Sequence, residues 1–156
     1  MKFIEIKGQI EDIEADALVY STNQNLRLTG GVGASLFKRY GYPAQAILDK
    51  HLSNLNTDTV DVGSIFEGTI EGMPWKRVFH TVATDLNYET NPEIVRDIIK
   101  ACLESCESDY SINSIAFSAL GSGFGSLKYP EFVKILNKEL EPYYDLDNLT
   151  IKLVSK

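Results

Sequence analysis

Glycines cluster at two places in the chain, and each cluster predicts a backbone site for an anion. The first cluster runs over residues 29–33 and follows the apolar stretch 17–20, while the second runs over residues 121–125 and follows the apolar stretch 114–117. Glycine lets the backbone adopt positive φ and approach a ligand without interference from a Cβ atom. A loop between a strand and a helix adds unpaired N–H groups and the positive end of the helix dipole. Two such loops in a small protein predict a ligand with a diphosphate held between them.

The elements that must position these loops alternate along the chain. The alternation predicts an α/β protein, a three-layer α/β/α sandwich with a central mixed, mostly parallel sheet. We expect one domain over residues 1–156, which is long enough for a substantial core. In open sheets of this kind, ligands bind beyond the carboxyl ends of the strands, where both glycine clusters would lie. The expected strands are 2–6, 16–21, 60–67, 76–82, 112–118 and 149–154, and the expected helices are 31–40, 43–53, 92–107 and 130–140.

Composition and charge exclude several classes of protein. The net charge is -7, which argues against general binding to the nucleic-acid backbone because that needs a basic face. The chain has no apolar run of about 18 residues or more, so no membrane span is expected. It begins with the alternating pattern of residues 3–6 rather than with a basic and then apolar leader. These features predict a cytoplasmic protein.

The cysteines and histidines predict neither a metal site nor a disulfide. Cys102 and Cys106 continue a row of apolar residues spaced four apart, so they are expected in the core of a helix that begins at Asn91 and Pro92. The chain has only two histidines, which leaves little material for a Cys/His zinc site. We therefore expect no metal and no cofactor.

Common nucleotide-binding motifs do not fit this sequence. The chain has no Gly-Lys-Ser/Thr sequence, which excludes a P-loop. The glycines of residues 121–125 lack the Rossmann spacing and occur late in the chain, whereas a dinucleotide-binding half needs that loop early. A Rossmann oxidoreductase is thus disfavoured.

The order of the motifs resembles that of the macrodomain family, whose members bind ADP-ribose or process its derivatives. The similar segments are 8–10, 15–26 with 30–36, 79–82, and 114–125, and they span nearly the whole chain in family order. The resemblance implies a three-layer α/β/α fold with a cleft for ADP-ribose. It places Gln9 and Ile10 beside the adenine, Asn23 beside the distal ribose, and the two glycine loops around the diphosphate and distal ribose. The ligand-binding residues that it implies are Gln9, Ile10, Tyr20, Asn23, Gly30, Gly31, Val32, Gly33, Ala34, Gly121, Ser122, Gly123, Phe124 and Gly125.

The sequence departs from the family pattern at four of these positions. Gln9 replaces the usual acid, although its amide oxygen can still accept a hydrogen bond from the adenine amine. Tyr20 and Gly33 stand where many hydrolytic members carry asparagine and aspartate, and Gly125 stands where many members carry tyrosine. These changes weaken the expectation of hydrolysis more than that of binding.

Several side chains have a second, purely structural interpretation. Asn23 lies near a turn and could make local bonds to the backbone instead of contacting a ligand. Tyr20 suits either the core or a pocket wall, and Phe124 suits either packing or stacking on a ribose. His80 lies in an apolar strand, where a structural role is expected.

Two classes of function remain, and we favour the first. One is a binding module whose partner is ADP-ribose or an ADP-ribosylated macromolecule. The other is an enzyme: an ADP-ribosyl hydrolase, an O-acetyl-ADP-ribose deacetylase or an ADP-ribose-1''-phosphate phosphatase. Without an acid at Gly33, catalysis would need Asn23 together with Asp85, or a water activated by the substrate. A macrodomain-like antitoxin or scaffold without a nucleotide ligand is a weaker third alternative.

Overall fold

The computed structural model describes residues 1–123 and 125–156, and six strands in this part of the chain form one mixed sheet. The strand order is β1-β6-β5-β2-β4-β3, and every neighbouring pair is parallel except β4 and β3. The strands are β1 (Lys2–Lys7), β2 (Ala17–Thr22), β3 (Ile65–Glu67), β4 (Arg77–Val82), β5 (Ser114–Ser118) and β6 (Thr150–Ser155). The helices are α1 (Gly31–Tyr40), α2 (Tyr42–Leu55), α3 (Pro92–Glu107) and α4 (Tyr129–Leu140), with 3-10 turns η1 (Ile10–Asp12) and η2 (Glu141–Tyr143).

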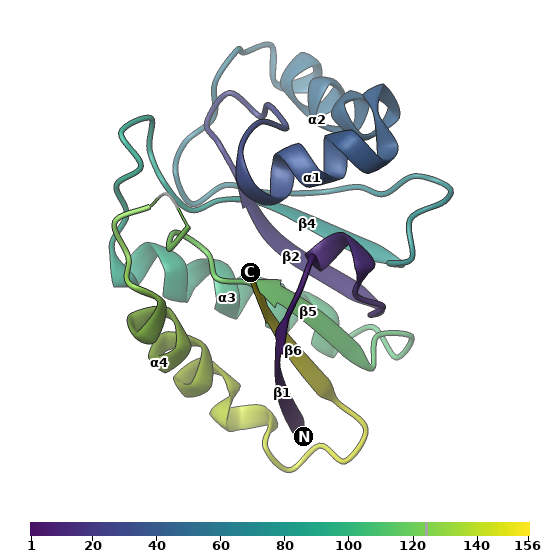
Figure 1. Ribbon diagram of the computed structural model, residues 1–156, viewed down its shortest axis with the longest axis vertical. Coiled ribbons are helices and arrows are strands. Elements are labelled where there is room, and N and C mark those ends of the chain that lie inside the picture. The colour runs from purple at the N-terminus through teal and green to yellow at the C-terminus, as the bar shows by residue number, and fades with distance from the viewer. Residues whose placement is uncertain (124) are drawn as a thin grey trace.

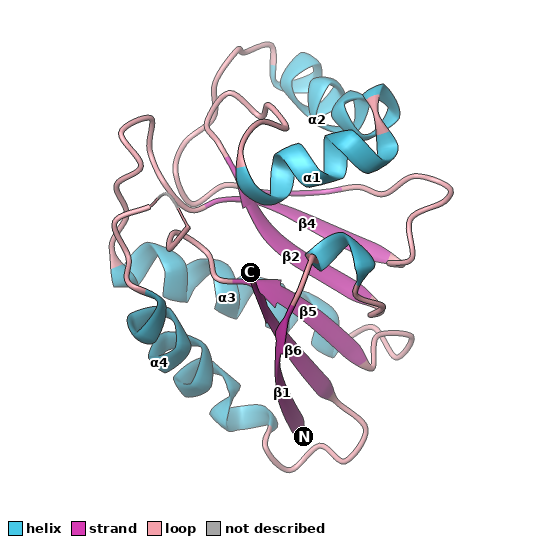
Figure 2. Ribbon diagram, in the orientation of Figure 1, coloured by secondary structure: helices cyan, strands magenta, loops and turns pink. Residues whose placement is uncertain are grey.

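The helices cover both faces of the sheet, which confirms the expected three-layer α/β/α fold (Figures 1 and 2). Successive side chains of a strand point to opposite faces. In β2, Ala17 and Val19 therefore pack toward α3 and α4, whereas Leu18 and Tyr20 pack toward α1 and α2. All four residues are fully buried, as expected for a central strand that is covered on both sides.

Most predicted elements agree with the observed ones to within two residues, but the third strand is much shorter than predicted. Only Ile65–Glu67 of the predicted strand 60–67 pairs with β4. The preceding segment bends at Gly63, which has φ 95° and donates its N–H to Val82 O. The apolar pattern there reflects burial of Val60 in a loop, where its N–H donates to Gln24 O, rather than strand pairing.

Helix α3 begins and packs as its sequence predicts. Asn91 is the N-cap, and its side-chain oxygen accepts a hydrogen bond of 2.9 Å from the Ile94 N–H. Cys102 and Cys106 are buried in the core between α3 and the sheet, and both are free thiols. Burial raises the pKa of the Cys106 thiol to about 11, as expected for an unreactive cysteine.

Two kinds of feature are absent from the part of the chain that the structure describes. No helix there is long and apolar enough to cross a membrane. Among the same residues, no group of three or more histidine, cysteine, aspartate or glutamate side chains is placed to hold a metal ion.

Replacement of the α3 N-cap should measurably destabilise the fold. Asn91→Ala removes the bond to Ile94, so we expect the free energy of unfolding to fall by about 1 kcal/mol. Urea unfolding monitored by circular dichroism measures this loss. Asn87→Ala, on an exposed turn, is the matched control and should change stability little. Equal stability of the two variants would contradict the capping role.

Candidate functional site

The sheet has a topological switch point between its two neighbouring strands β2 and β5. These strands run parallel, with Leu18 opposite Ala116. Beyond β2 the chain turns to α1 on one face of the sheet, and beyond β5 it turns to α4 on the other face (Figure 1). Parallel α/β sheets bind ligands in the crevice that such a divergence opens at the carboxyl ends of the strands.

Three loops meet at this edge, because β2, β4 and β5 are neighbours and end there. We call them L1 (residues 23–30, after β2), L2 (residues 83–91, after β4) and L3 (residues 119–128, after β5). Phe124, a predicted ligand contact in L3, lies outside the described residues.

In L1, the Asn23 side chain bonds to the backbone of its own loop. Its Oδ1 accepts from the Arg27 N–H at 3.0 Å, and its Nδ2 donates to Arg27 O at 2.9 Å. Nδ2 also lies 3.3 Å from the Thr29 hydroxyl oxygen. The structural alternative considered for Asn23 is thus present in the fold, and a ligand contact stays a prediction.

A second polar side chain, Gln45 of α2, holds the backbone of L1 by hydrogen bonds. Its Oε1 accepts from the Leu28 N–H at 2.9 Å, and its Nε2 donates to Leu26 O at 2.8 Å. Gln45 is only 6% exposed, so loss of either bond would leave buried polar groups unpaired. Sequence reasoning missed this residue, although a glutamine next to buried Ala44 on an otherwise apolar helix face was an available signal.

The start of α1 offers unpaired amides to the crevice. Gly30 and Gly31 have φ values of 65° and 51°, a region that favours glycine, and no described side chain caps the helix. The first turn contains no acidic residue. Gly33 is buried, and a Cβ atom there would lie 3.3 Å from Leu28 Cα. An anion at this helix start would therefore meet backbone N–H groups and the positive end of the dipole.

The glycines of L3 have different roles in shaping the loop. Gly121 has φ 73°, and its carbonyl accepts from the Leu127 N–H at 3.1 Å. A Cβ atom on Gly125 would lie 2.0 Å from that same carbonyl oxygen, so the loop requires glycine at position 125. A Cβ atom on Gly123 would meet nothing within 4 Å. Gly125 thus serves the loop itself, whereas the space beside Gly123 is open.

L2 connects the other two loops. On one side, the Leu86 N–H donates to Gln24 Oε1 of L1 at 3.2 Å. On the other side, the Thr90 N–H donates to Ser126 Oγ of L3 at 3.0 Å, and the Ser126 N–H donates to Tyr88 O at 2.9 Å. The loops therefore hold one another in place across the switch point.

Two further predicted site residues also make bonds within their own loops. Asp85 Oδ1 accepts from the Asn87 N–H at 2.8 Å and from the Glu89 N–H at 3.0 Å, which closes the turn of L2. The Ser122 hydroxyl donates to Ala119 O at 3.0 Å. No comparison tests the catalytic role predicted for Asp85 or the ligand contact predicted for Ser122, and both stay predictions.

The structure places Tyr20 in the core, one of the two alternatives considered for it, and its ligand contact stays a prediction. Tyr20 is fully buried on the face beneath α1 and α2, and its hydroxyl bonds to Nδ1 of His80 on the neighbouring strand β4. His80 Nε2 bonds to Gly68 O at 2.9 Å. Burial raises the pKa of the Tyr20 hydroxyl and lowers the pKa of His80 to about 4. A neutral His80 that accepts from Tyr20 and donates to Gly68 satisfies both ring nitrogens.

Gln9 and Ile10 lie at η1, directly after β1, and this turn packs against α1. Gln9 is exposed, while Ile10 is 5% exposed and belongs to the core beneath α1 and α2. An ion pair of 2.6 Å between Asp12 and Arg39 joins η1 to the end of α1. The two residues predicted beside the adenine thus differ in accessibility, and only Gln9 presents a polar group at the surface.

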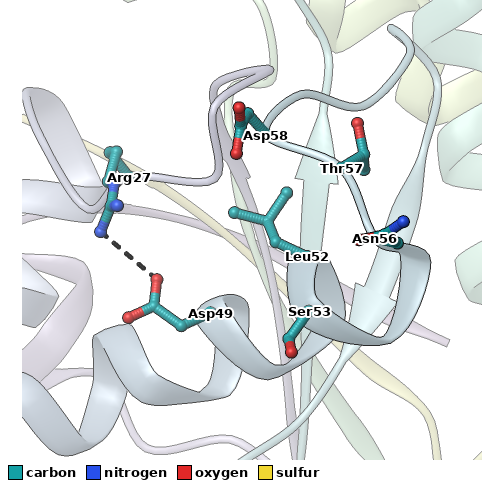
Figure 3. A pocket seen from close by; sticks show the side chains of 7 residues that line it. All are labelled: Arg27, Asp49, Leu52, Ser53, Asn56, Thr57 and Asp58. Carbon is teal, nitrogen blue, oxygen red and sulfur yellow. Dashed lines mark hydrogen bonds and ion pairs between the residues drawn. The ribbon is translucent and has the colours of Figure 1, made fainter.

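Two cavities lie in the described part of the chain, and their lining includes none of the described residues 30–34, 121–123 and 125. The larger one, about 490 Å³, lies on the outer side of L1, between Arg27 and the end of α2 (Figure 3). Arg27 and Asp49 form an ion pair of 3.3 Å across it. The smaller cavity, about 270 Å³, lies at the opposite end of the sheet, near the start of β5.

The fold and the loops define an α/β protein with two glycine-shaped loops at a switch point of its sheet, and the comparisons identify the family. A family model described as Macro domain matches residues 19–136. The chain therefore belongs to the macrodomain family, which confirms the predicted resemblance.

Individual relatives extend over most of the chain. An uncharacterized protein of Saccharolobus solfataricus is 29% identical over 138 residues, which cover 88% of this chain and 76% of that protein. The mouse protein mono-ADP-ribosyltransferase PARP9 is 31% identical over 153 residues, which cover 96% of this chain and 17% of that protein. A Trypanosoma brucei macrodomain solved in complex with ADP-ribose has a TM-score of 0.77 and 18% identity, over 99% of this chain and 64% of that chain.

The buried His80 should make the fold sensitive to mild acid. Its pKa of about 4 lies below the ordinary value of 6.5, so between these values the unfolded chain binds a proton that the folded chain does not. The free energy of unfolding should therefore fall as the pH drops from 6.5 to 4, by about 3 kcal/mol at most. Urea unfolding across this range measures the slope.

Two further measurements assign that slope to His80. The variant His80→Gln should flatten it, whereas His51→Gln, at a half-buried position of α2, should retain it. In the wild-type protein, an NMR titration should show the His80 ring neutral down to a pH of about 4. An ordinary titration midpoint near 6.5 would contradict the neutral, doubly bonded ring.

Proposed function

We propose that this chain binds ADP-ribose, free or as a modification of a macromolecule, at the edge where β2 and β5 end. The observation that carries the proposal is the pairing of two glycine-shaped loops from adjacent strands that diverge to opposite faces of the sheet. The Trypanosoma brucei macrodomain, which was solved with ADP-ribose, supports this choice of ligand. A diphosphate fits between the loops because each one supplies amides to an anion.

Backbone groups, rather than side-chain cations, hold the diphosphate in this proposal. Residues 30–34 and 121–125 contain no lysine or arginine, and the chain carries a net charge of -7. An anion that approaches an acidic protein needs local partial positive charge. The uncapped start of α1 supplies it through N–H groups and the helix dipole.

The two ends of the ligand are assigned to Gln9 and Asn23. Gln9 is exposed at η1, where its amide oxygen can accept from the adenine amine, while buried Ile10 fixes the turn. Asn23 Oδ1 accepts from Arg27, and a carbonyl oxygen has a second lone pair for a ribose hydroxyl. Asn23 would then both shape L1 and contact the distal ribose.

Binding is a better proposal than hydrolysis for this site. Hydrolysis needs a positioned water and a group that orients or deprotonates it. Gly33 supplies no acid, and a side chain there would press on the Leu28 backbone. Asp85, the other candidate, has one carboxylate oxygen bonded to two amides of L2. A hydrolase built from Asn23 and Asp85 remains the alternative function.

Isothermal titration calorimetry with ADP-ribose and with AMP tests the proposed ligand. ADP-ribose should bind at micromolar strength, equivalent to about -7 to -8 kcal/mol. AMP should bind at least about tenfold more weakly, because it cannot occupy both loops. Equal affinities for the two ligands would contradict the two-loop site.

A pair of variants tests how the diphosphate is held. Gly123→Val adds a branched side chain in open space, so the fold should survive while close approach of the ligand is blocked and binding is lost. Lys128→Ala removes an exposed cation beside L3 and should weaken binding by about 1 kcal/mol or less. Calorimetry measures both affinities, and circular dichroism checks the fold. Loss of binding in Lys128→Ala together with retention in Gly123→Val would show that side-chain charge holds the ligand.

A further inference from the structure

The end of the sheet opposite the glycine loops contains a separate hollow of about 270 Å³. It lies between the last turns of α3 and the segments that lead into β5 and β6. Buried Leu103, Ile112 and Leu149 form its floor. Cavities for drug-sized ligands have about 300–1,000 Å³, so this hollow suits one large side chain better than a nucleotide.

Large apolar side chains stand exposed beside this hollow. Tyr110 and Leu146 line it and are 95% and 44% exposed, and the neighbouring Tyr144 is 46% exposed. Exposed aromatic and aliphatic side chains gathered around an apolar hollow are typical of a surface that contacts a partner. The apolar surface alone does not identify the kind of partner. The charged side chains around the hollow are needed to infer it.

The surroundings of the hollow are strongly acidic. The chain has no lysine or arginine in residues 101–127 or 139–151, and these two ranges include every residue that lines the hollow. Asp145 and Asp147 flank Leu146, both are exposed, and neither forms an ion pair with a described residue. Glu107 and Asp109 line the hollow itself, and Glu104 lies near its lining residue Tyr143.

Three cations from other elements that reach this end of the molecule bond to neighbouring groups. Arg77 bonds to Glu67 and to Ser105 O and lies 3.5 Å from Asp109. Lys76 donates to Ser111 O at 2.9 Å, and the N-terminal amine donates to Tyr144 O at 3.0 Å. Burial and the nearby Glu107 and Glu104 raise the pKa of Tyr143, another lining residue, to about 12. This shift is consistent with a negative local potential.

We propose that the hollow is a docking site for a protein segment that inserts one bulky apolar side chain flanked by lysines or arginines. The apolar floor and Tyr110 accept the side chain, and the exposed carboxylates beside Leu146 attract the flanking cations. Nucleic acids and other polyanions are disfavoured by the same carboxylates. The hollow is separate from the glycine loops. It lies at the amino ends of β5 and β6, whereas the glycine loops follow the carboxyl ends of β2 and β5.

Fluorescence anisotropy with a synthetic peptide tests this proposal. The probe is a fluorescein-labelled hexapeptide with phenylalanine and leucine between two pairs of lysines. It should bind saturably to the full chain, and binding should weaken with added salt. Tyr110→Ala removes an exposed contact, and the double variant Asp145→Lys/Asp147→Lys reverses the charge. Each should lower the affinity by about fivefold or more.

Control variants distinguish peptide binding at the hollow from non-specific binding and from binding at the proposed nucleotide site. Tyr42→Ala removes a tyrosine that is 78% exposed on α2, and Glu71→Lys reverses an exposed charge on another turn. Both should bind the peptide like the wild type. Saturation with ADP-ribose should leave peptide affinity unchanged, as should Gly123→Val.

Several results would overturn the proposal. One is the absence of saturable binding, and another is equal binding of a peptide with glutamates in place of the lysines. Unchanged affinity in either test variant would exclude the hollow or the carboxylates as the contact. Sedimentation equilibrium that shows a dimer dissociated by Tyr110→Ala would assign the hollow to a second copy of this chain instead.

Discussion

The parallel pairing of β2 with β5 is the constraint on which the rest of the structure depends. These strands occur far apart in the sequence, yet Leu18 lies opposite Ala116 at the centre of the sheet. Because the chain leaves them toward opposite faces, their carboxyl ends cannot be covered by one connection. The backbone amides beyond both strands are thereby left to meet a ligand. The glycines make this geometry possible, since the start of α1 and the turn at Gly121 both require positive φ.

Polar side chains around the crevice serve mainly to hold the loops in place. Gln45 fixes L1 from α2, Gln24 and Ser126 tie L2 to its neighbours, and Asp85 closes the turn of L2. Loops tied in this way lose less conformational freedom on binding, so less of the interaction free energy is spent on ordering them. In the proposed complex, the backbone would therefore recognise the diphosphate, since neither glycine cluster contains a lysine or arginine.

Local sequence predicted the elements well, and the contacts between distant segments poorly. Helix α3 is bounded as predicted because its N-cap and apolar spacing are local signals, and the family motifs led to the correct fold. Local sequence did not decide between core and pocket wall for Tyr20, because its burial depends on His80 of the neighbouring strand, sixty positions away. Gln45 was missed because its role also depends on a contact that is distant in the sequence. It lies on α2 and accepts a hydrogen bond from the Leu28 N–H of L1. The predicted third strand failed because the pattern of burial at Val60 is the same for a packed loop and a strand.

The acidity of the chain is compatible with an anionic ligand because one large group of its carboxylates lies at the far end of the sheet from the crevice. The carboxylates around the apolar hollow lie at the amino end of the sheet, whereas the glycine loops lie at the carboxyl end. Strand β5 has five residues, and at about 3.3 Å per residue it separates the two ends by about 16 Å. The Debye length at physiological salt is about 8 Å, so the exposed carboxylates at one end barely oppose a diphosphate at the other. One small sheet can therefore carry an anion site at one end and a cation-attracting surface at the other.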